Sequence, residues 1–126
     1  MEKINGKAAF YDQSAITAQA IIEKGYTGGK IIFGRDDFGG GDNADEAVKM
    51  LKNNGVLSVV VSGANSSFRT SAENEKLNVI SLDKKSVEDI FRTFADKDSE
   101  AAVITNDDGT KKVKLISGSL SKSYQF

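Results

Sequence analysis

The sequence contains no cysteine, no histidine, no proline and no tryptophan among its 126 residues. Without cysteine and histidine, the chain by itself cannot form a disulfide, a Cys/His zinc site or a set of iron–sulfur ligands. It also cannot supply a cysteine nucleophile or a histidine general base. Without proline, its turns depend on the 12 glycines and on asparagine, aspartate and serine. These absences exclude most of the common catalytic constellations.

An excess of positive charge is also absent, because 17 Lys and Arg residues stand against 18 Asp and Glu residues. We therefore expect no nucleic-acid partner, since binding to a phosphate backbone requires a basic surface. No segment approaches the roughly 20 apolar residues of a membrane-spanning helix, and Met1–Gly6 has no apolar signal segment. We expect no membrane association and a cytoplasmic location. The length and the hydrophobic content of 39% predict a single domain over residues 1–126.

The central part of the chain predicts a strand, a glycine-rich loop, a helix and a second strand. Lys30–Gly34 and Val56–Val61 are short apolar runs of the kind buried in α/β sheets. Between them, apolar residues recur at helical spacing, and Asp42 or Asn43 can cap the helix that Gly55 ends. This order implies a right-handed βαβ crossover between parallel strands. The residues expected on the buried helix face are Ala44, Ala47, Val48 and Leu51.

The flanking segments complete an α/β fold with a mixed sheet and a C-terminal β-hairpin. The turn sequence at residues 106–109 between two apolar runs is a strong hairpin signal. The tail from Gly118 to Phe126 is serine-rich, and its packing stays open at this point. The other expected elements are a strand at Ile4–Tyr11 with a polar turn at Asp12–Ser14, a short helix or ordered loop at Ile16–Gly25, a helix from Ser66 or Ser67, a strand at Leu77–Leu82, a helix opened by a capping box at Ser86 and Asp89, and hairpin strands at Ala101–Thr105 and Lys112–Ile116.

The loop Arg35–Glu46 is the segment with the strongest functional character. It joins the carboxyl end of a buried strand to the start of a helix, where free N–H groups favour anions. The glycines at 39–41 allow positive φ and close approach to the backbone. Arg35 and Arg69 each lie near the end of a strand, where a guanidinium could pair with a ligand carboxylate. The alternative for both arginines is a solvated surface position.

Two other chemistries fit this loop less well. Gly39-x-Gly41-x-x-Ala44 has the letters of a dinucleotide fingerprint, but the fingerprint opens directly after its strand and Gly39 comes five residues after Gly34. The loop acids invite a Mg²⁺ or Ca²⁺ interpretation, although the spacing of an EF-hand is missing. Asp42 and its acidic neighbours in the first helical turn can equally stabilise the helix N-terminus. We therefore assign no metal site.

The segment Gly34–Ala47, with the helix and the Val-rich strand that follow, resembles the swivelling domain of the aconitase superfamily. In size the chain is most similar to the small subunit of 3-isopropylmalate dehydratase. That family places Gly-x-Asn-Phe-Gly-x-Gly-Ser-Ser-Arg-Glu-His-Ala between a strand and a helix, and Asn5–Ala8 and Ile16–Ile22 are similar to its opening strand and turn. The resemblance covers about residues 4–82 and implies a swivelling β/β/α fold. The loop residues in step with the family are Phe38, Gly39, Gly41 and Ala47.

The sequence departs from the family at the residues that act. The two loop serines of the family, one of them its catalytic base, fall on Asp42 and Asn43, and its substrate arginine falls on Ala44. The acid of the turn falls on Gln19, and another family arginine falls on Ser66. A carboxylate at Asp42 would repel an acidic substrate where the family offers hydroxyls.

The resemblance implies two functions. In the first, the chain is the small-subunit-like domain of a hydro-lyase that acts on a small hydroxy acid. A large partner subunit then carries the [4Fe–4S] cluster, this chain binds no cofactor, and Asp42 replaces serine as general base. In the second, the chain keeps the fold without catalysis and acts as a binding or interaction module, which the missing Ser-Ser-Arg favours. The substrate-binding candidates are Arg35, Gly39, Gly40, Gly41, Asn43 and Arg69.

A generic flavodoxin-like α/β domain is a third alternative. That fold alternates strands and helices along the whole chain. The expected C-terminal hairpin fits such an alternation poorly.

Overall fold

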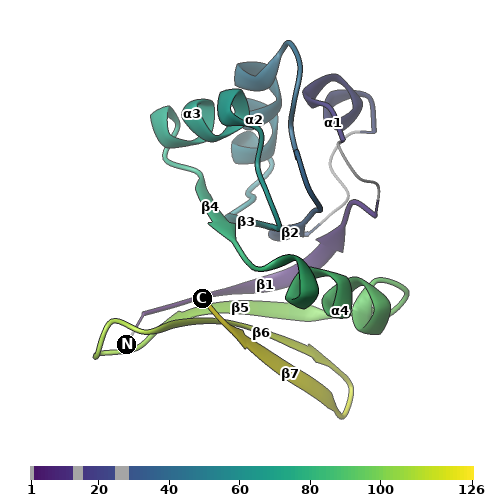
Figure 1. Cartoon of the computed structure of the whole chain (residues 1–126), viewed down its shortest axis with the longest axis vertical. Coiled ribbons are helices and arrows are strands. Elements are labelled where there is room, and N and C mark those ends of the chain that lie inside the picture. Colours follow the sequence, from purple (N-terminus) through teal and green to yellow (C-terminus); the bar gives the residue numbers. More distant parts are fainter. Residues whose placement is uncertain (1, 13–15, 25–28) are drawn as a thin grey trace.

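The structure is a computed structural model, and it describes residues 2–12, 16–24 and 29–126. Strands and helices alternate from β1 to α4, and three strands follow one another at the end of the chain (Figure 1). The elements are β1 (Glu2–Phe10), α1 (Ala18–Lys24), β2 (Ile31–Phe33), α2 (Ala44–Asn53), β3 (Ser58–Val61), α3 (Ser66–Asn74), β4 (Asn78–Ser81), α4 (Lys84–Phe94), β5 (Glu100–Thr105), β6 (Lys111–Ser117) and β7 (Leu120–Gln125).

The seven strands form one mixed sheet in the order β4-β3-β2-β1-β5-β6-β7. The first four are parallel, and β5, β6 and β7 are added antiparallel. The long β1 joins the two halves, because residues 8–10 pair with β2 while residues 2–7 pair with β5 (Figure 1). The mixed α/β sheet and the βαβ crossover that the sequence predicted are therefore confirmed.

Each face of the parallel half covers its own hydrophobic core. Helices α1, α2 and α3 pack on one face, where Ile32 and Val59 join the buried side of α2. Helix α4 packs on the other face, where Phe33 and Val60 meet Phe94. Because successive strand residues point to opposite faces, both faces need apolar side chains. This explains the unbroken hydrophobic runs of β2 and β3.

Several local predictions are confirmed. Helix α2 buries Ala44, Ala47, Val48 and Leu51 as the spacing predicted. Gly55 follows its end with φ +86°, the left-handed conformation typical of a residue after a helix. The predicted turn at residues 106–109 joins β5 to β6.

Two capping predictions are wrong. Asn43 precedes α2 in a left-handed conformation and its side chain makes no cap hydrogen bond. Helix α4 begins at Lys84, two residues before the predicted Ser86, because Asp83 accepts the backbone N–H of Ser86. Asp89, assigned to the capping box from the sequence, bonds instead to side chains of β7.

The C-terminal tail forms a strand that the sequence did not reveal. Residues 120–125 pair with β6, so that the predicted hairpin is two thirds of a three-stranded meander. Leu120 and Tyr124 pack against the α4 core, whereas Phe126 stays partly exposed. The predicted turn residues Gln13 and Ser14 and the predicted helix end at Gly25 lie outside the described residues. Within the described ranges, no helix has the length and apolarity needed to cross a membrane.

Candidate functional site

The loop between β2 and α2 is tied by its backbone to both neighbouring segments. On one side, Gly39 donates to the carbonyl of Ile16 (2.7 Å), and Gly40 accepts from the N–H of Ala18 (2.8 Å). On the other side, Phe38 donates to Gly63 (3.0 Å) and its carbonyl accepts from the N–H of Asn65. These bonds fix the loop of residues 34–43, which we call the strap, over the carboxyl ends of the parallel strands.

The strap depends on backbone conformations that most residues avoid. Positive φ angles occur at Asp37 (54°), Gly39 (81°), Gly41 (85°) and Asn43 (70°). Gly39 also lies directly on the ring of Phe68, where an added Cβ would come within 2.3 Å of a ring carbon. Nothing lies within 4 Å of the equivalent position at Gly41. Gly39 is thus required by packing, whereas Gly41 leaves the backbone open before α2.

The fold brings together two positions, Gln19 and Asn43, at which the sequence departs from the family. The side-chain amide of Asn43 donates to Oε1 of Gln19 at 2.6 Å, although 24 residues separate them. Asp42 precedes Asn43 in the chain and has an exposed side chain, and Ala44 is buried at the first turn of α2. The side chains at 19 and 43 therefore meet, next to the exposed Asp42 in the chain.

A shallow hollow of about 410 Å³ opens at the start of α2. Its walls come from the end of the strap, the first turn of α2 and the facing side of α3. Inside it, the hydroxyl of Ser71 donates to the carboxylate of Asp45. Ser66 lies on the neighbouring surface, which it shares with Asp45 and Ser71. The residues that line the hollow are Gly41, Asn43, Ala44, Asp45, Glu46, Ser67 and Ser71.

The three consecutive glycines of the sequence prediction hold different positions. Gly39 and Gly40 are buried, and their backbone groups form hydrogen bonds of the strap. Of the three glycines, Gly41 lines the hollow. The structure therefore places Gly41, Asp42 and Asn43 at one exposed location. Gly39 and Gly40 lie buried in the strap directly before it.

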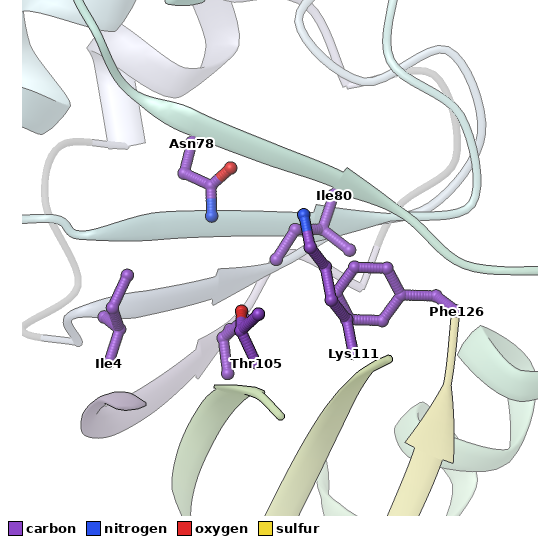
Figure 2. A pocket seen from close by; sticks show the side chains of 7 residues that line it. Ile4, Asn78, Ile80, Thr105, Lys111 and Phe126 are labelled. Carbon is purple, nitrogen blue, oxygen red and sulfur yellow. The ribbon is translucent and has the colours of Figure 1, made fainter. Parts of the chain in front are cut away.

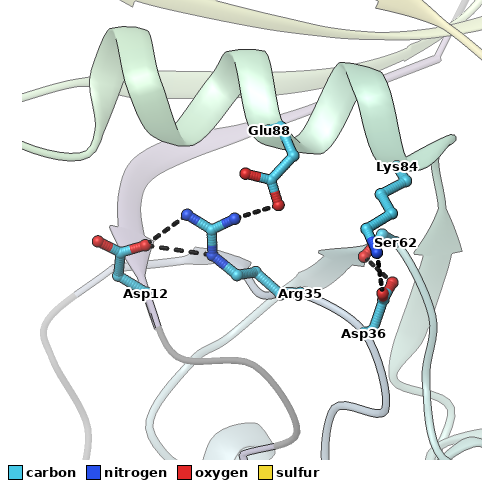
Figure 3. A network of polar contacts seen from close by, with 6 residues as sticks. All are labelled: Asp12, Arg35, Asp36, Ser62, Lys84 and Glu88. Atoms are coloured by element: carbon cyan, nitrogen blue, oxygen red, sulfur yellow. Dashed lines mark hydrogen bonds and ion pairs between the residues drawn. The ribbon is translucent and has the colours of Figure 1, made fainter.

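Arg35 is held between two carboxylates of this same chain (Figure 3). Its Nε and Nη2 donate to Oδ1 of Asp12 at 3.2 and 2.7 Å, and its Nη1 donates to Glu88. The guanidinium carbon also lies 4.3 Å from the ring centroid of Phe91. The pKa of Arg35 is raised, chiefly by its bond to Glu88. A ligand carboxylate at Arg35 would have to compete with both acids.

A second polar network beside Arg35 joins the strap to α4. The hydroxyl of Ser62 donates to Asp36 at 2.5 Å, and Lys84 Nζ lies 3.1 Å from the other carboxylate oxygen (Figure 3). The Ser62 hydroxyl, followed by Lys84, lowers the pKa of Asp36. Sequence reasoning missed this network, because its members are far apart in the chain and share no motif.

Arg69 lies away from the hollow at α2. Its Nη2 donates to the hydroxyl of Ser81 at 2.7 Å, on the side of α3 that borders β4. It lines a separate hollow with Leu77 and Val79. The residues that line the hollow at α2 include neither of the two arginines that the sequence singled out, and they do not include Asp42.

The described part of the chain has no group of three or more His, Cys, Asp or Glu side chains arranged to hold a metal ion. With neither cysteine nor histidine in the sequence, the usual iron–sulfur ligands are also missing. A [4Fe–4S] cluster does not fit this chain by itself, and a partner would have to supply its ligands.

No family model matches this sequence, and no curated protein matches it. Among solved structures, the crystal structure of 3-isopropylmalate dehydratase from Methanocaldococcus jannaschii is similar, with a TM-score of 0.62 and 15% sequence identity. The match covers 99% of this chain and 83% of that one. It spans the parallel half and the C-terminal meander together, which the loop resemblance alone did not reach. The chain therefore has the α/β fold of this dehydratase, with a mixed seven-stranded sheet and helices on both of its faces.

Proposed function

We propose that this chain is the small-subunit-like domain of a hydro-lyase that acts on a small hydroxy acid together with a large iron–sulfur subunit. The observation that carries this proposal is the likeness of fold over 99% of the chain. The strap supports it, because Asn43 meets Gln19 and Asp42 is exposed beside Asn43 in the chain, at positions that the loop resemblance makes catalytic or substrate-binding candidates. The strap is also rigidly bonded on both sides, as a positioning loop must be.

In this proposal Asp42 is the general base. Its carboxylate is exposed, so that a partner subunit can cover it and bring a substrate to it. It would take a proton from the carbon adjacent to the one that bears the hydroxyl, so that the C–H electron pair forms the double bond as the hydroxyl leaves. Gly41 would leave room for the substrate. The Lewis acidity that the departing hydroxyl needs would come from a cluster held by the partner and not by residues of this chain.

The substrate carboxylate needs a cation, and the proposal retains Arg35 and Arg69 as candidates. Arg35 would have to exchange Asp12 or Glu88 for the ligand, and Arg69 would have to release Ser81. The bidentate geometry of a guanidinium suits such an exchange. Asn43 is exposed on the strap and bonds to Gln19, and its side chain would also contact the substrate.

A second candidate function is a binding or interaction module without catalysis. The observation that favours it is the engagement of both arginines by groups of this same chain, while Ala44 stands at the family's arginine position. In that case the hollow at α2 would bind a partner and carry out no reaction.

Anaerobic purification of the chain from its native extract distinguishes these functions. The hydro-lyase proposal expects a large co-purifying protein with the visible absorption of an iron–sulfur cluster. It also expects the complex to form or hydrate an unsaturated acid, measured by ultraviolet absorption. Asp42→Asn should abolish that activity without releasing the partner, whereas Glu100→Gln, an exposed acid on β5, should leave it unchanged. A chain that emerges alone and colourless would overturn the proposal in favour of the module.

A further inference from the structure

Strand β4 is the open edge of the parallel half of the sheet. It pairs with β3 on one side and ends the strand order. Leu82 donates its N–H to Val61 of β3. Because alternate residues of an edge strand point away from the ladder, Val79 and Ser81 direct their N–H and C=O groups outward. Within the described ranges, no backbone group is bonded to them from that side.

Two hollows of about 240 Å³ each flank this edge on opposite faces of the sheet. The first lies on the α4 side, where Ile80 packs into the α4 core (Figure 2). The second lies on the α3 side, where Val79 packs against the other core. Val79 and Ile80 thus border different hollows, as the alternation of a strand requires, and Asn78 at the start of β4 borders both.

This arrangement fits an added strand. A peptide that pairs with Val79 and Ser81 would direct successive side chains to opposite faces, and hence into the two hollows in turn. Since β4 has four residues, few backbone bonds are available to such a guest. The hollows must therefore supply much of the affinity and all of the sequence preference.

The first hollow specifies the chemistry of the guest side chain. Ile4, Ile80 and Val103 give it an aliphatic part beside the ring of Phe126, and Asn78 and Thr105 add neutral polar groups (Figure 2). At its rim stands Lys111, for which the described residues provide no acidic partner. A glutamate side chain suits both the aliphatic part and this lysine, because its methylene groups can cover the aliphatic part while its carboxylate pairs with the ammonium.

The second hollow has a different character. Arg69 and Glu73 both line it beside Leu77 and Val79, so their charges offset each other. A neutral guest side chain suits this mixture. The expected guest therefore alternates an acidic residue on the α4 side with a neutral residue on the α3 side.

We propose that the β4 edge binds an extended peptide segment of a partner protein as an additional strand, with an acidic side chain directed to Lys111. The proposal does not rest on the hydro-lyase function, because neither the strap nor Asp42 takes part in it, and the two proposals share only Arg69, which lines the second hollow. The first hollow comes from β1, β4, β5, β6 and the C-terminal Phe126, and the second from α3, Leu77 and β4.

Selection from a random-peptide display library against the full chain tests this proposal. We expect enriched peptides with acidic and neutral residues in alternation. Lys111→Met should weaken their binding about tenfold, and replacing the peptide's acid by its amide should have the same effect. Lys112→Met is the matched control, since this lysine lies on the opposite face of β6 and should leave affinity unchanged.

Backbone pairing is tested separately. Bound peptide should protect the amides of Val79 and Ser81 from hydrogen exchange. Ser81→Pro should abolish binding while thermal unfolding stays close to that of the parent, because proline is tolerated where the N–H points out of an edge strand. The exchange measurement stands by itself if that variant fails to fold.

Three results would overturn the proposal. The first is a selection that enriches no peptide. The second is binding that ignores Lys111→Met and leaves the amides of Val79 and Ser81 unprotected. The third is a β4 edge occupied by a second copy of the chain, which sedimentation of the free protein would reveal.

Discussion

The hydroxyl of Tyr124 donates to Oδ2 of Asp89 at 2.6 Å, which joins the last strand to α4 across 35 residues of sequence. Lys122 Nζ lies 3.0 Å from the same oxygen, and Arg92 bonds to the other carboxylate oxygen at 2.7 Å. The Tyr124 hydroxyl, followed by Lys122 and Arg92, lowers the pKa of Asp89 to about 2. Burial and the bond to Asp89 raise the pKa of Tyr124. This cluster holds β7 against the helix.

Asp89 should make stability depend on pH in the acid range. Because folding lowers the pKa of Asp89 from 3.8 to about 2, its contribution is present above pH 3.8 and is lost as the pH falls through about 2. Asp89→Asn should cost about 1 kcal/mol at neutral pH and flatten this part of the profile. Urea unfolding at several pH values measures both effects.

The comparison with Asp89→Asn is needed because the pKa values of other carboxyl groups are also lowered in the folded chain, so that these groups also lose their contribution to stability at acid pH. Hydrogen bonds lower the pKa of Asp36, Asp83 and Asp108 as well. The difference between the parent and Asp89→Asn isolates Asp89. An equal loss of stability on acidification in both proteins would contradict the role given to the cluster.

Gly39→Ala should destabilise the chain by about 3 kcal/mol, since the new methyl group would strike the ring of Phe68 at a positive φ. Gly41→Ala shares the positive φ but meets no neighbour within 4 Å, so a cost of about 1 kcal/mol is expected. Chemical denaturation of both variants gives the two values. Similar losses would show that packing on Phe68 does not distinguish the glycines.

Arg35→Met should cost roughly 1–2 kcal/mol, because it removes two ion pairs and the cation above the Phe91 ring. Added salt should destabilise the parent more than the variant, which keeps only the other ion pairs of the chain. Thermal unfolding at low and high salt measures this difference. Arg35→Lys provides the control that keeps the charge and loses the paired donors. An unchanged salt response in Arg35→Met would argue that the guanidinium serves a ligand instead of the fold.

Asp42→Asn should leave stability within about 0.5 kcal/mol of the parent, since the side chain is exposed and has no side-chain partner among the described residues. A functional base would nevertheless be lost. Denaturation and the hydro-lyase assay, performed on the same sample, separate the two effects. A large loss of stability would assign Asp42 to the structure of the strap.

Local pattern predicted the parts of the fold in which neighbouring residues decide the outcome. The apolar spacing around Ala47 and Val48 predicted helix α2, and Gly55 follows the end of this helix as expected. The strand at residues 120–125 gave no such signal, because its exposed and half-buried residues alternate among serines. Its place depends on pairing with β6 and on the contact between Tyr124 and Asp89.

The candidate site divides in the same way. The sequence indicated the strap, its glycines and the start of α2, since a glycine-rich loop between a buried strand and a helix is a local feature. It could not show that Asn43 meets Gln19, or that Arg35 meets Glu88 across 53 residues. It also suggested that the Asn43 side chain caps α2. The loop is bonded to its neighbouring segments, and Asn43 has a left-handed backbone conformation without a side-chain cap bond.

The sequence by itself determined the alternation of strands and helices, the buried face of α2 and the glycine strap, because these depend on residues close together in the chain. Tertiary structure alone decided which charged groups meet, which glycine carries the packing on Phe68, and which strand is left as an open edge. Those outcomes follow from contacts between distant segments, whose free energies exist only once the sheet order has been set.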